Sequence, residues 1–200
     1  DAVFLAVGAQ VSKVVGIESD GIIPILSALD VLRNSENDEP TGLNGKVVVY
    51  GGGNTAIDVA RTAIRLGALD VHIITVENSE KMPAHEMEVR EALEEGIQVM
   101  NLRSIQRSEG KTLVLEKMVD TEGDWPQATG QYENFSADVL VQALGQNVNT
   151  DPFAKIDGMV INGGVVQVDS SMMTGKDGIF AGGDMVPSLR TATAAIGHGK

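Results

Sequence analysis

Residues 46–67, with the sequence K-V-V-V-Y-G-G-G-N-T-A-I-D-V-A-R-T-A-I-R-L-G, decide the fold of this chain. The β-branched run at 47–49 is typical of a strand buried on both faces. Three glycines, Gly51–Gly53, then predict a sharp turn, and Asn54 stands where a helix N-cap is expected. Gly67 ends the helix. Apolar residues recur inside it at helical spacing, at positions 56, 57, 60, 63 and 64.

The glycine turn matches the spacing G-x-G-x-x-A, which predicts a site for the pyrophosphate of a dinucleotide. Gly51 makes the turn, and Gly53 lacks a Cβ, so a phosphate can approach the backbone. The helix then directs free N–H groups and its positive dipole end at the phosphate. A glycine turn in an unrelated α/β protein remains the alternative. The candidate binding residues are Gly51, Gly52, Gly53, Asn54, Thr55 and Ala56.

A second strand is predicted at 71–76, and Glu77 follows it, 21 residues after Ala56. A carboxylate at this place can accept hydrogen bonds from the adenosine ribose, and it repels a 2′-phosphate. We therefore expect NAD(H) to be preferred over NADP(H). Alternatively, Glu77 simply faces solvent. Cations that could relieve the repulsion are Lys81, Arg61 and Arg65.

Composition sets limits on function. The 200 residues are 42% hydrophobic, carry a net charge of −13 and contain no cysteine. The charge makes nucleic acid and anionic membranes poor partners, and the missing cysteine excludes disulfides, thiolate catalysis and cysteine-ligated metal sites within the chain. No apolar run reaches 18 residues and no signal peptide is apparent, so we expect a cytoplasmic protein without membrane insertion.

Two stretches of the chain share the pattern D-x-h-h-x-A-h-G, where h is apolar. They lie at 1–8 and 138–145 and end at Gly8 and Gly145. Each predicts a buried strand that runs into a glycine, which suggests two related nucleotide-binding domains, although coincidence remains open. Between them, we predict a short helix from the apolar residues at 25, 26, 29 and 32, a hairpin turning at 109–110, and a loop or loosely paired strand at 121–136.

Five motifs in a fixed order resemble the two-dinucleotide-binding-domain flavoproteins, and most closely the glutamate synthase small (β) subunit family. They are D-A-V-F-L-A-V-G-A at 1–9, I-L-S-A-L-D-V-L at 25–32, G-K-V-V-V-Y-G-G-G-N-T-A-I-D-V-A at 45–60, M-P-A at 82–84 with E-E-G at 94–96, and G-I-F-A-G-G-D at 178–184 with A-I-G-H-G-K at 195–200. The third and fifth motifs together are the specific ones.

The resemblance implies an α/β fold in which a Rossmann-like domain, with three layers around a parallel sheet, is inserted into a partial FAD-binding domain. Residues 43–148 would form the NAD(P)-binding domain. Residues 1–42, with a linker, and 149–200 would belong to the FAD-binding domain. The cofactor-binding residues expected beyond the glycine turn and Glu77 are Gly8, Gly145, Gly183, Asp184 and Thr191.

The activity implied is that of a component of a flavin-dependent NAD(P)H oxidoreductase, which passes hydride to FAD and electrons onward to an iron–sulfur partner. No catalytic side chain and no metal site are expected, because the cofactors carry the chemistry. The final electron acceptor stays open. The alternatives are a non-catalytic nucleotide-binding or docking domain, and a flavin-free NAD-dependent dehydrogenase, for which no acid or base is found.

The chain also departs from the family's pattern. Val7 replaces the family's usual threonine in A-T-G, and Val76 and Glu77 stand where NADPH-using members carry an arginine pair. The chain begins without Met inside a predicted strand, so we expect a fragment that lacks the family's N-terminal region with its FAD-binding glycine loop. FAD is then expected in the full-length protein but not in this fragment, which alone would be inactive.

Overall fold

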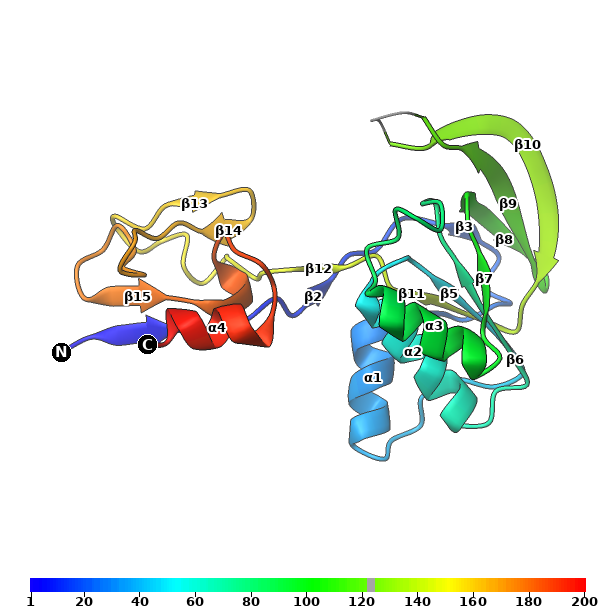
Figure 1. Cartoon of the computed structure of the whole chain (residues 1–200), viewed down its shortest axis with the longest axis horizontal. Helices are drawn as coiled ribbons and strands as arrows, with labels where there is room; N and C mark the ends of the chain where they lie inside the picture. Colours follow the sequence, from blue (N-terminus) through cyan, green and yellow to red (C-terminus); the bar gives the residue numbers. More distant parts are fainter. Residues whose placement is uncertain (122–124) are drawn as a thin grey trace. The chain divides into compact units, whose positions relative to one another are not determined.

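The chain forms two compact units, shown in the computed structural model of Figure 1, which describes residues 1–121 and 125–200. The smaller unit comprises Asp1–Val11 and Gln146–Lys200, and the larger unit comprises Ser12–Gly145. Residues 12–42, expected from the sequence to belong with residues 1–11, thus pack within the larger unit. Which cofactor each unit binds remains a prediction at this point.

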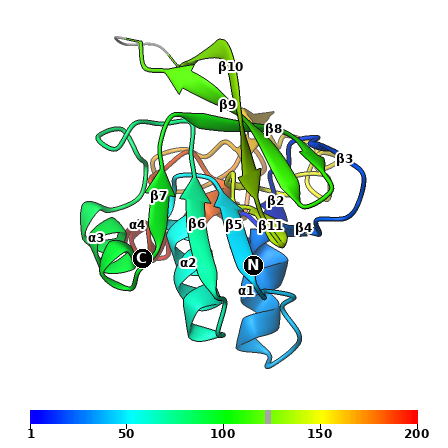
Figure 2. The same ribbon diagram turned by 90° about the vertical axis from the view of Figure 1, so that its right-hand side faces the viewer.

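A five-stranded parallel sheet organises the larger unit (Figure 2). Its strand order is β4 (Ile25–Ser27), β11 (Val139–Gln142), β5 (Lys46–Tyr50), β6 (Asp70–Ile74) and β7 (Gln98–Met100). All four neighbouring pairs are parallel, so their carboxyl ends lie at one edge of the sheet. This edge is where nucleotides bind in open α/β sheets.

Helices cover one face of this sheet. α1 (Ala28–Glu36), α2 (Asn54–Arg65) and α3 (Glu86–Glu94) pack on the same side (Figure 2). Val47 and Val49 of β5 meet this helical layer, in a cluster that includes the wholly buried residues of α2. The predicted β5–turn–α2 unit is therefore confirmed, because the apolar face of α2 covers the strand that precedes it.

A mixed sheet, in which two of the three strand pairs are antiparallel, covers the opposite face, so the third layer is not helical. Val48 and Tyr50, which alternate with Val47 and Val49, pack against Ile105, Leu113 and Leu115 of this sheet. The hairpin predicted at 109–110 is confirmed. Of the segment predicted at 121–136, residues 122–124 lie outside the described residues. The strand order in this second sheet is β10 (Gln127–Ser136), β9 (Thr112–Val119), β8 (Arg103–Glu109) and β3 (Glu18–Ser19).

The smaller unit contains a two-stranded parallel sheet, in which Leu5 is in register with Ala181. A cluster around Val166, Met185 and Val186 forms its core. The two copies of the repeat fall in different units, since the first contains β1 and the second contains β11. The elements of this unit and the connecting strands are β1 (Val3–Leu5), β2 (Val11–Ser12), β12 (Gln146–Asn147), β13 (Ile161–Asn162), β14 (Val165–Val166), β15 (Ile179–Ala181), the 3-10 helix η1 (Gly183–Met185) and α4 (Ala192–His198).

One predicted helix is partly wrong. Ile25 and Leu26 were expected to open a helix with Leu29 and Leu32, but they form β4 and pair with Leu140 and Val141 of β11. The apolar spacing fits both structures, and pairing with a strand more than a hundred residues away decides between them. α1 begins only at Ala28.

Candidate nucleotide-binding site

The glycine turn lies at the carboxyl end of β5, between the ends of its two neighbours. Gly51 donates its N–H to the carbonyl of Ile74 in β6, at 2.9 Å, and Ala143 after β11 donates to the carbonyl of Tyr50, at 2.8 Å. Gly51 has φ +145°, and a Cβ there would collide with the carbonyl oxygen of Ala143. Only glycine fits this position, because the chain passes so close to β11.

Gly53 faces open space. Apart from the two chain neighbours of Gly53, no atom of the residues that the structure describes would lie within 4 Å of a Cβ at this position. The extended backbone of Gly53, with φ −92° and ψ 175°, suits any residue. The structure therefore provides no packing reason for glycine at this position. Its bare face fits the close approach of a pyrophosphate to the backbone, as the motif predicts.

The predicted N-cap is wrong. Gly53 is the N-cap of α2, and Asn54 is the first helical residue. The Asn54 side chain points instead toward the segment before α3, where its Oδ1 accepts the N–H of His85 at 2.9 Å. No acidic residue lies in the first turn of α2, so no carboxylate of the helix itself competes for the positive end of the helix dipole.

The third small position of the motif is a packing position. Ala56 is completely buried in the cluster between α2 and the parallel sheet, and it donates its N–H to the carbonyl of Gly53 at 2.9 Å. Thr55, beside it, is partly exposed. The close contact of helix and strand that the motif requires is present.

Glu77 lies beside the glycine turn. β6 ends at Ile74, three residues earlier than Glu77 and two residues earlier than predicted. The Oε2 of Glu77 accepts a hydrogen bond from the hydroxyl of Thr75. A Cβ on Gly52 would lie 2.6 Å from the Thr75 Oγ1 and 2.9 Å from this Oε2. The carboxylate is therefore held directly against the middle glycine of the turn.

A segment at 82–85 crosses the same turn, and it was missed as a part of the site. The N–H of Ala84 donates to the carbonyl of Gly52 at 3.0 Å, while His85 binds Asn54 as described above. The Pro83 Cδ would lie 3.4 Å from a Cβ on Gly52. In both hydrogen bonds this segment contributes a backbone N–H, so the residue types at 84 and 85 give no signal for them. The M-P-A motif at 82–84 was the only sequence feature that marked the segment.

The cations near Glu77 are engaged with other carboxylates. Lys81 Nζ lies 2.9 Å from Asp120 and lowers the pKa of that carboxyl group. Arg103, which follows β7, pairs with Glu133 of β10. The two arginines of α2 bind α3: Arg61 pairs with Glu91 at 2.9 Å and Glu95 at 2.7 Å, and Arg65 pairs with Glu95 at 3.2 Å.

Gly145 is the predicted site residue that follows β11. It has φ +99° and accepts the N–H of Lys13 at 2.9 Å through its carbonyl. A Cβ placed on Gly145 would lie 3.8 Å from the Lys13 side chain, which is an ordinary van der Waals contact. Because β11 is parallel to β5, Gly145 and the glycine turn lie at the same edge of the sheet.

The remaining predicted residues belong to the smaller unit. Gly8 and Gly183 follow β1 and β15, which are parallel neighbours, so both lie beyond the same end of this strand pair. Gly183, with φ +72°, donates its N–H to the Nδ1 of His198 at 3.0 Å. Thr191 caps α4 by accepting the N–H of Ala194 at 3.1 Å. Asp184 is partly exposed, and no partner of its carboxylate is seen among the described residues.

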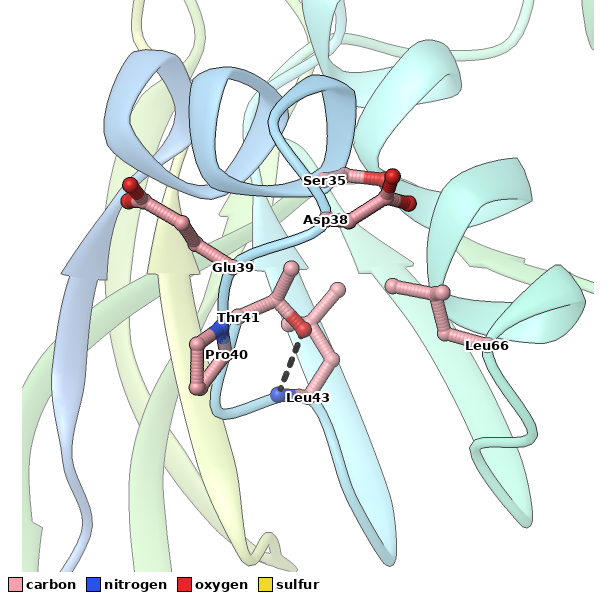
Figure 3. Close-up of a pocket in the computed structure, with 7 residues that line it drawn as sticks. All are labelled: Ser35, Asp38, Glu39, Pro40, Thr41, Leu43 and Leu66. Carbon is pink, nitrogen blue, oxygen red and sulfur yellow. Dashed lines mark hydrogen bonds between the residues drawn. The ribbon is translucent and has the colours of Figure 1, made fainter.

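A cavity of about 310 Å³ lies elsewhere in the larger unit (Figure 3). Leu43 precedes β5 and Leu66 follows α2, so the cavity is at the amino ends of the strands, opposite to the glycine turn. None of the predicted site residues lines it. Its lining residues are Ser35, Asp38, Glu39, Pro40, Thr41, Leu43 and Leu66.

The parallel sheet, the glycine turn and the carboxylate that follows the second strand define a Rossmann-like fold. Residues 1–199 match the family described as pyridine nucleotide-disulphide oxidoreductase, and the chain belongs to this family. No helix in the part of the chain that the structure describes is long and apolar enough to cross a membrane.

Curated relatives support the resemblance to the glutamate synthase small chain. The chain is 33% identical to "Glutamate synthase [NADPH] small chain" of Escherichia coli K12, over 100% of this chain and 48% of that protein. It is 34% identical to "NADP(+)-dependent formate dehydrogenase subunit beta" of Moorella thermoacetica, over 100% of this chain and 30% of that protein. The chain thus spans between about a third and a half of these relatives' lengths.

Solved structures agree on the fold. The thioredoxin reductase of T. acidophilum superposes with a TM-score of 0.76 at 19% identity, over 99% of this chain and 62% of that one. The enzyme of Lactococcus lactis superposes with a TM-score of 0.77 at 18% identity, over 99% and 62%. The predicted α/β fold is confirmed.

Proposed function

We propose that this chain is the nicotinamide-nucleotide-binding part of a flavin-dependent oxidoreductase, in which hydride passes from NAD(P)H to FAD and electrons pass on to an iron–sulfur partner. The observation that carries the proposal is the glycine turn with its open face at Gly53. The smaller unit would contribute to the FAD site through Gly8, Gly183, Asp184 and Thr191. The names of the curated relatives, which describe subunits of NADPH- or NADP(+)-linked enzymes, support the redox role.

The residues of the larger unit would bind and orient the dinucleotide. Gly53 admits the pyrophosphate to the backbone, and the first turn of α2 offers N–H groups and a positive dipole end. Glu77 has one carboxylate oxygen bound to Thr75, which leaves the other to accept a hydrogen bond from the adenosine ribose. When bound, the nicotinamide supplies hydride and the flavin accepts it, so the protein needs no acid, base or nucleophile.

Asp184 and Gly183 would serve the flavin in a similar way. Asp184 lies in η1, three residues after β15 ends at Ala181, and its carboxylate can accept hydrogen bonds from ribityl hydroxyls. His198 holds the N–H of Gly183, which fixes the backbone just before this carboxylate. The Asp184 carboxylate suits a polyol ligand, because an ionised carboxylate accepts hydrogen bonds and hydroxyl groups donate them.

We further propose that this chain prefers NADH to NADPH, although its relatives are named for NADPH or NADP(+). A 2′-phosphate beside Glu77 would meet a like charge at about 4 Å, which costs ~4 kcal/mol at an effective dielectric near 20, before screening by salt. Lys81 and Arg103, two cations in the segments next to Glu77, are paired with Asp120 and Glu133. They would have to break these pairs to neutralise the phosphate.

Calorimetry with NADH and NADPH tests both proposals. We expect the wild-type chain to bind NADH at least about tenfold more tightly than NADPH, because the charge repulsion exceeds 1.4 kcal/mol. Glu77→Arg should equalise or reverse this ratio, since Arg binds phosphate well. Glu80→Arg, three residues away in an exposed part of the same loop, serves as the matched control for net charge. Equal affinities in the wild type, or an unmoved ratio in Glu77→Arg, would show that Glu77 is not the selector.

A docking module without redox function is the other class of protein that fits a nucleotide-binding fold. Flavin absorbance separates the two, when measured on the protein as it is expressed from its complete gene. Near-stoichiometric FAD supports the oxidoreductase, and its absence supports the docking module.

A further inference from the structure

Thr75 is buried at the carboxyl end of β6, and its hydroxyl contacts the carboxylate of Glu77. The residue is only 1% exposed. Its backbone is fixed on both sides, because its N–H donates to the carbonyl of Met100 at 3.1 Å and its carbonyl accepts the N–H of Arg103 at 2.9 Å. The hydroxyl is thus a rigid donor, positioned by the sheet and not by the loop that follows.

The backbone of Glu77 is fixed independently of its side chain. Its carbonyl accepts the N–H of Leu102 at 3.2 Å and the Nδ2 of Asn101 at 3.2 Å. What remains free is the glutamate side chain, with its three rotatable bonds. Only the Thr75 hydroxyl, among the described residues, donates to the carboxylate. A single buried donor therefore decides where the charge of Glu77 lies.

We propose that Thr75 is a positioning residue for cofactor selection. By holding Oε2 of Glu77 against Gly52, it fixes a negative charge at the turn and aims Oε1 at the ribose. This inference rests on the proposed function, in which Glu77 distinguishes NADH from NADPH. Without the hydroxyl, the carboxylate turns into solvent, where it neither accepts from the ribose nor repels a 2′-phosphate effectively, because water screens exposed charges.

The geometry of Gly52 supports this role. Because Gly52 has no Cβ, there is room beside it for the Thr75 hydroxyl and the Glu77 carboxylate. The Thr75 Oγ1 lies 2.6 Å, and the Glu77 Oε2 2.9 Å, from the position that a Cβ would take. The Pro83 Cδ lies on a third side, 3.4 Å from the same Cβ position, and Glu77 is only partly exposed. A charge in such a place is screened less than one on the open surface, so its position matters for discrimination.

The experiment is a double-mutant cycle on the full chain, with the dissociation constants of NADH and NADPH as readouts. Thr75→Val removes the hydroxyl and keeps the shape, whereas Thr75→Ser keeps the hydroxyl. We expect Thr75→Val to reduce the preference for NADH by about tenfold, as for the loss of one hydrogen bond to a charged group. Thr75→Ser should retain the preference. In a Glu77→Gln background, Thr75→Val should change the ratio no further.

Three results would overturn the inference. If Thr75→Val lowers both affinities equally, Thr75 has only a structural role, and Glu77 remains the selector provided that its own variants move the ratio. If Thr75→Val changes the ratio as much in the Glu77→Gln background, Thr75 does not act through Glu77. If neither dinucleotide binds the wild-type chain, the proposed function fails and the inference fails with it.

Discussion

At the scale of single residues, the three adjacent glycines differ in what surrounds them. A Cβ would meet the carbonyl of Ala143 at Gly51, and the oxygens of Thr75 and Glu77 at Gly52. At Gly53 it would meet no atom within 4 Å among the described residues, its two chain neighbours aside. The first glycine is thus required by the fold, the second by the placement of a carboxylate, and the third by nothing in the protein itself. The close approach of a ligand to the backbone, as the motif predicts, gives a physical reason for the third.

This difference predicts opposite outcomes for two substitutions. Gly53→Val should weaken dinucleotide binding by about a hundredfold or more, roughly 2.7 kcal/mol, because its branched side chain fills the phosphate site. Its extended backbone tolerates Val, so the melting temperature should change little. Gly51→Ala should instead destabilise the protein, since its Cβ collides with β11. Calorimetry and thermal melting measure the two effects, and unchanged affinity in Gly53→Val would contradict the assigned site.

At the scale of elements, the loop before β11 is tied to the loop before β5 by one aspartate. Asp138 Oδ2 accepts the N–H of Lys46 at 2.9 Å, and Oδ1 accepts from Lys111 Nζ at 2.7 Å. The Lys111 ammonium, followed by the N–H of Lys46, lowers the pKa of this carboxyl group below its ordinary value of 3.8. Gly45, with φ +65°, makes room for the carboxylate, because a Cβ there would collide with it.

The direction of this pKa shift predicts how stability depends on pH. A carboxyl group with a lower pKa in the folded state stabilises the fold above its unfolded pKa, and the contribution is lost as the pH falls through the folded value. Asp138→Asn should therefore lower the melting temperature slightly at pH 7, and the difference should shrink as the pH falls below the ordinary pKa of 3.8 and through the lowered pKa of the folded state. Asp157→Asn, in an exposed part of the smaller unit, removes the same charge as a control. A difference that persists at low pH would exclude the ionised carboxylate as its cause.

The elements also show how far the sequence could predict the fold and the site. The β5–turn–α2 unit was predictable because its pattern is local and its glycines have distinct spacing. β4 was not, since its strand character depends on pairing with β11. Glu77 was found from its distance to the motif. Thr75, two residues earlier, would have required the knowledge that β6 ends at Ile74, so that the chain turns and brings both side chains to Gly52.

At the scale of the whole molecule, the larger unit is one continuous stretch of chain, residues 12–145, while the smaller unit is made of the two ends. The larger unit contains the glycine turn, Glu77 and Thr75. It also contains residues 12–42, which contribute Ile23 and Val31 to the two cores on either side of the parallel sheet, 1% and 2% exposed respectively. The domain boundary expected at residue 43 would leave these residues out.

Two truncations test which boundary is energetically correct. Residues 12–145 alone should fold and bind NADH with an affinity close to that of the full chain. Residues 43–148 should melt at a much lower temperature or not fold, because they lack β4 and α1. Loss of the buried side chains of Ile23 and Val31 alone removes about 3–6 kcal/mol of hydrophobic stabilisation. This is a large part of the free energy of unfolding of a typical domain, about 5–15 kcal/mol. Equal melting temperatures for the two truncations would show that residues 12–42 do not stabilise the larger unit. Failure of residues 12–145 to fold would show that the larger unit depends on the smaller one for its stability.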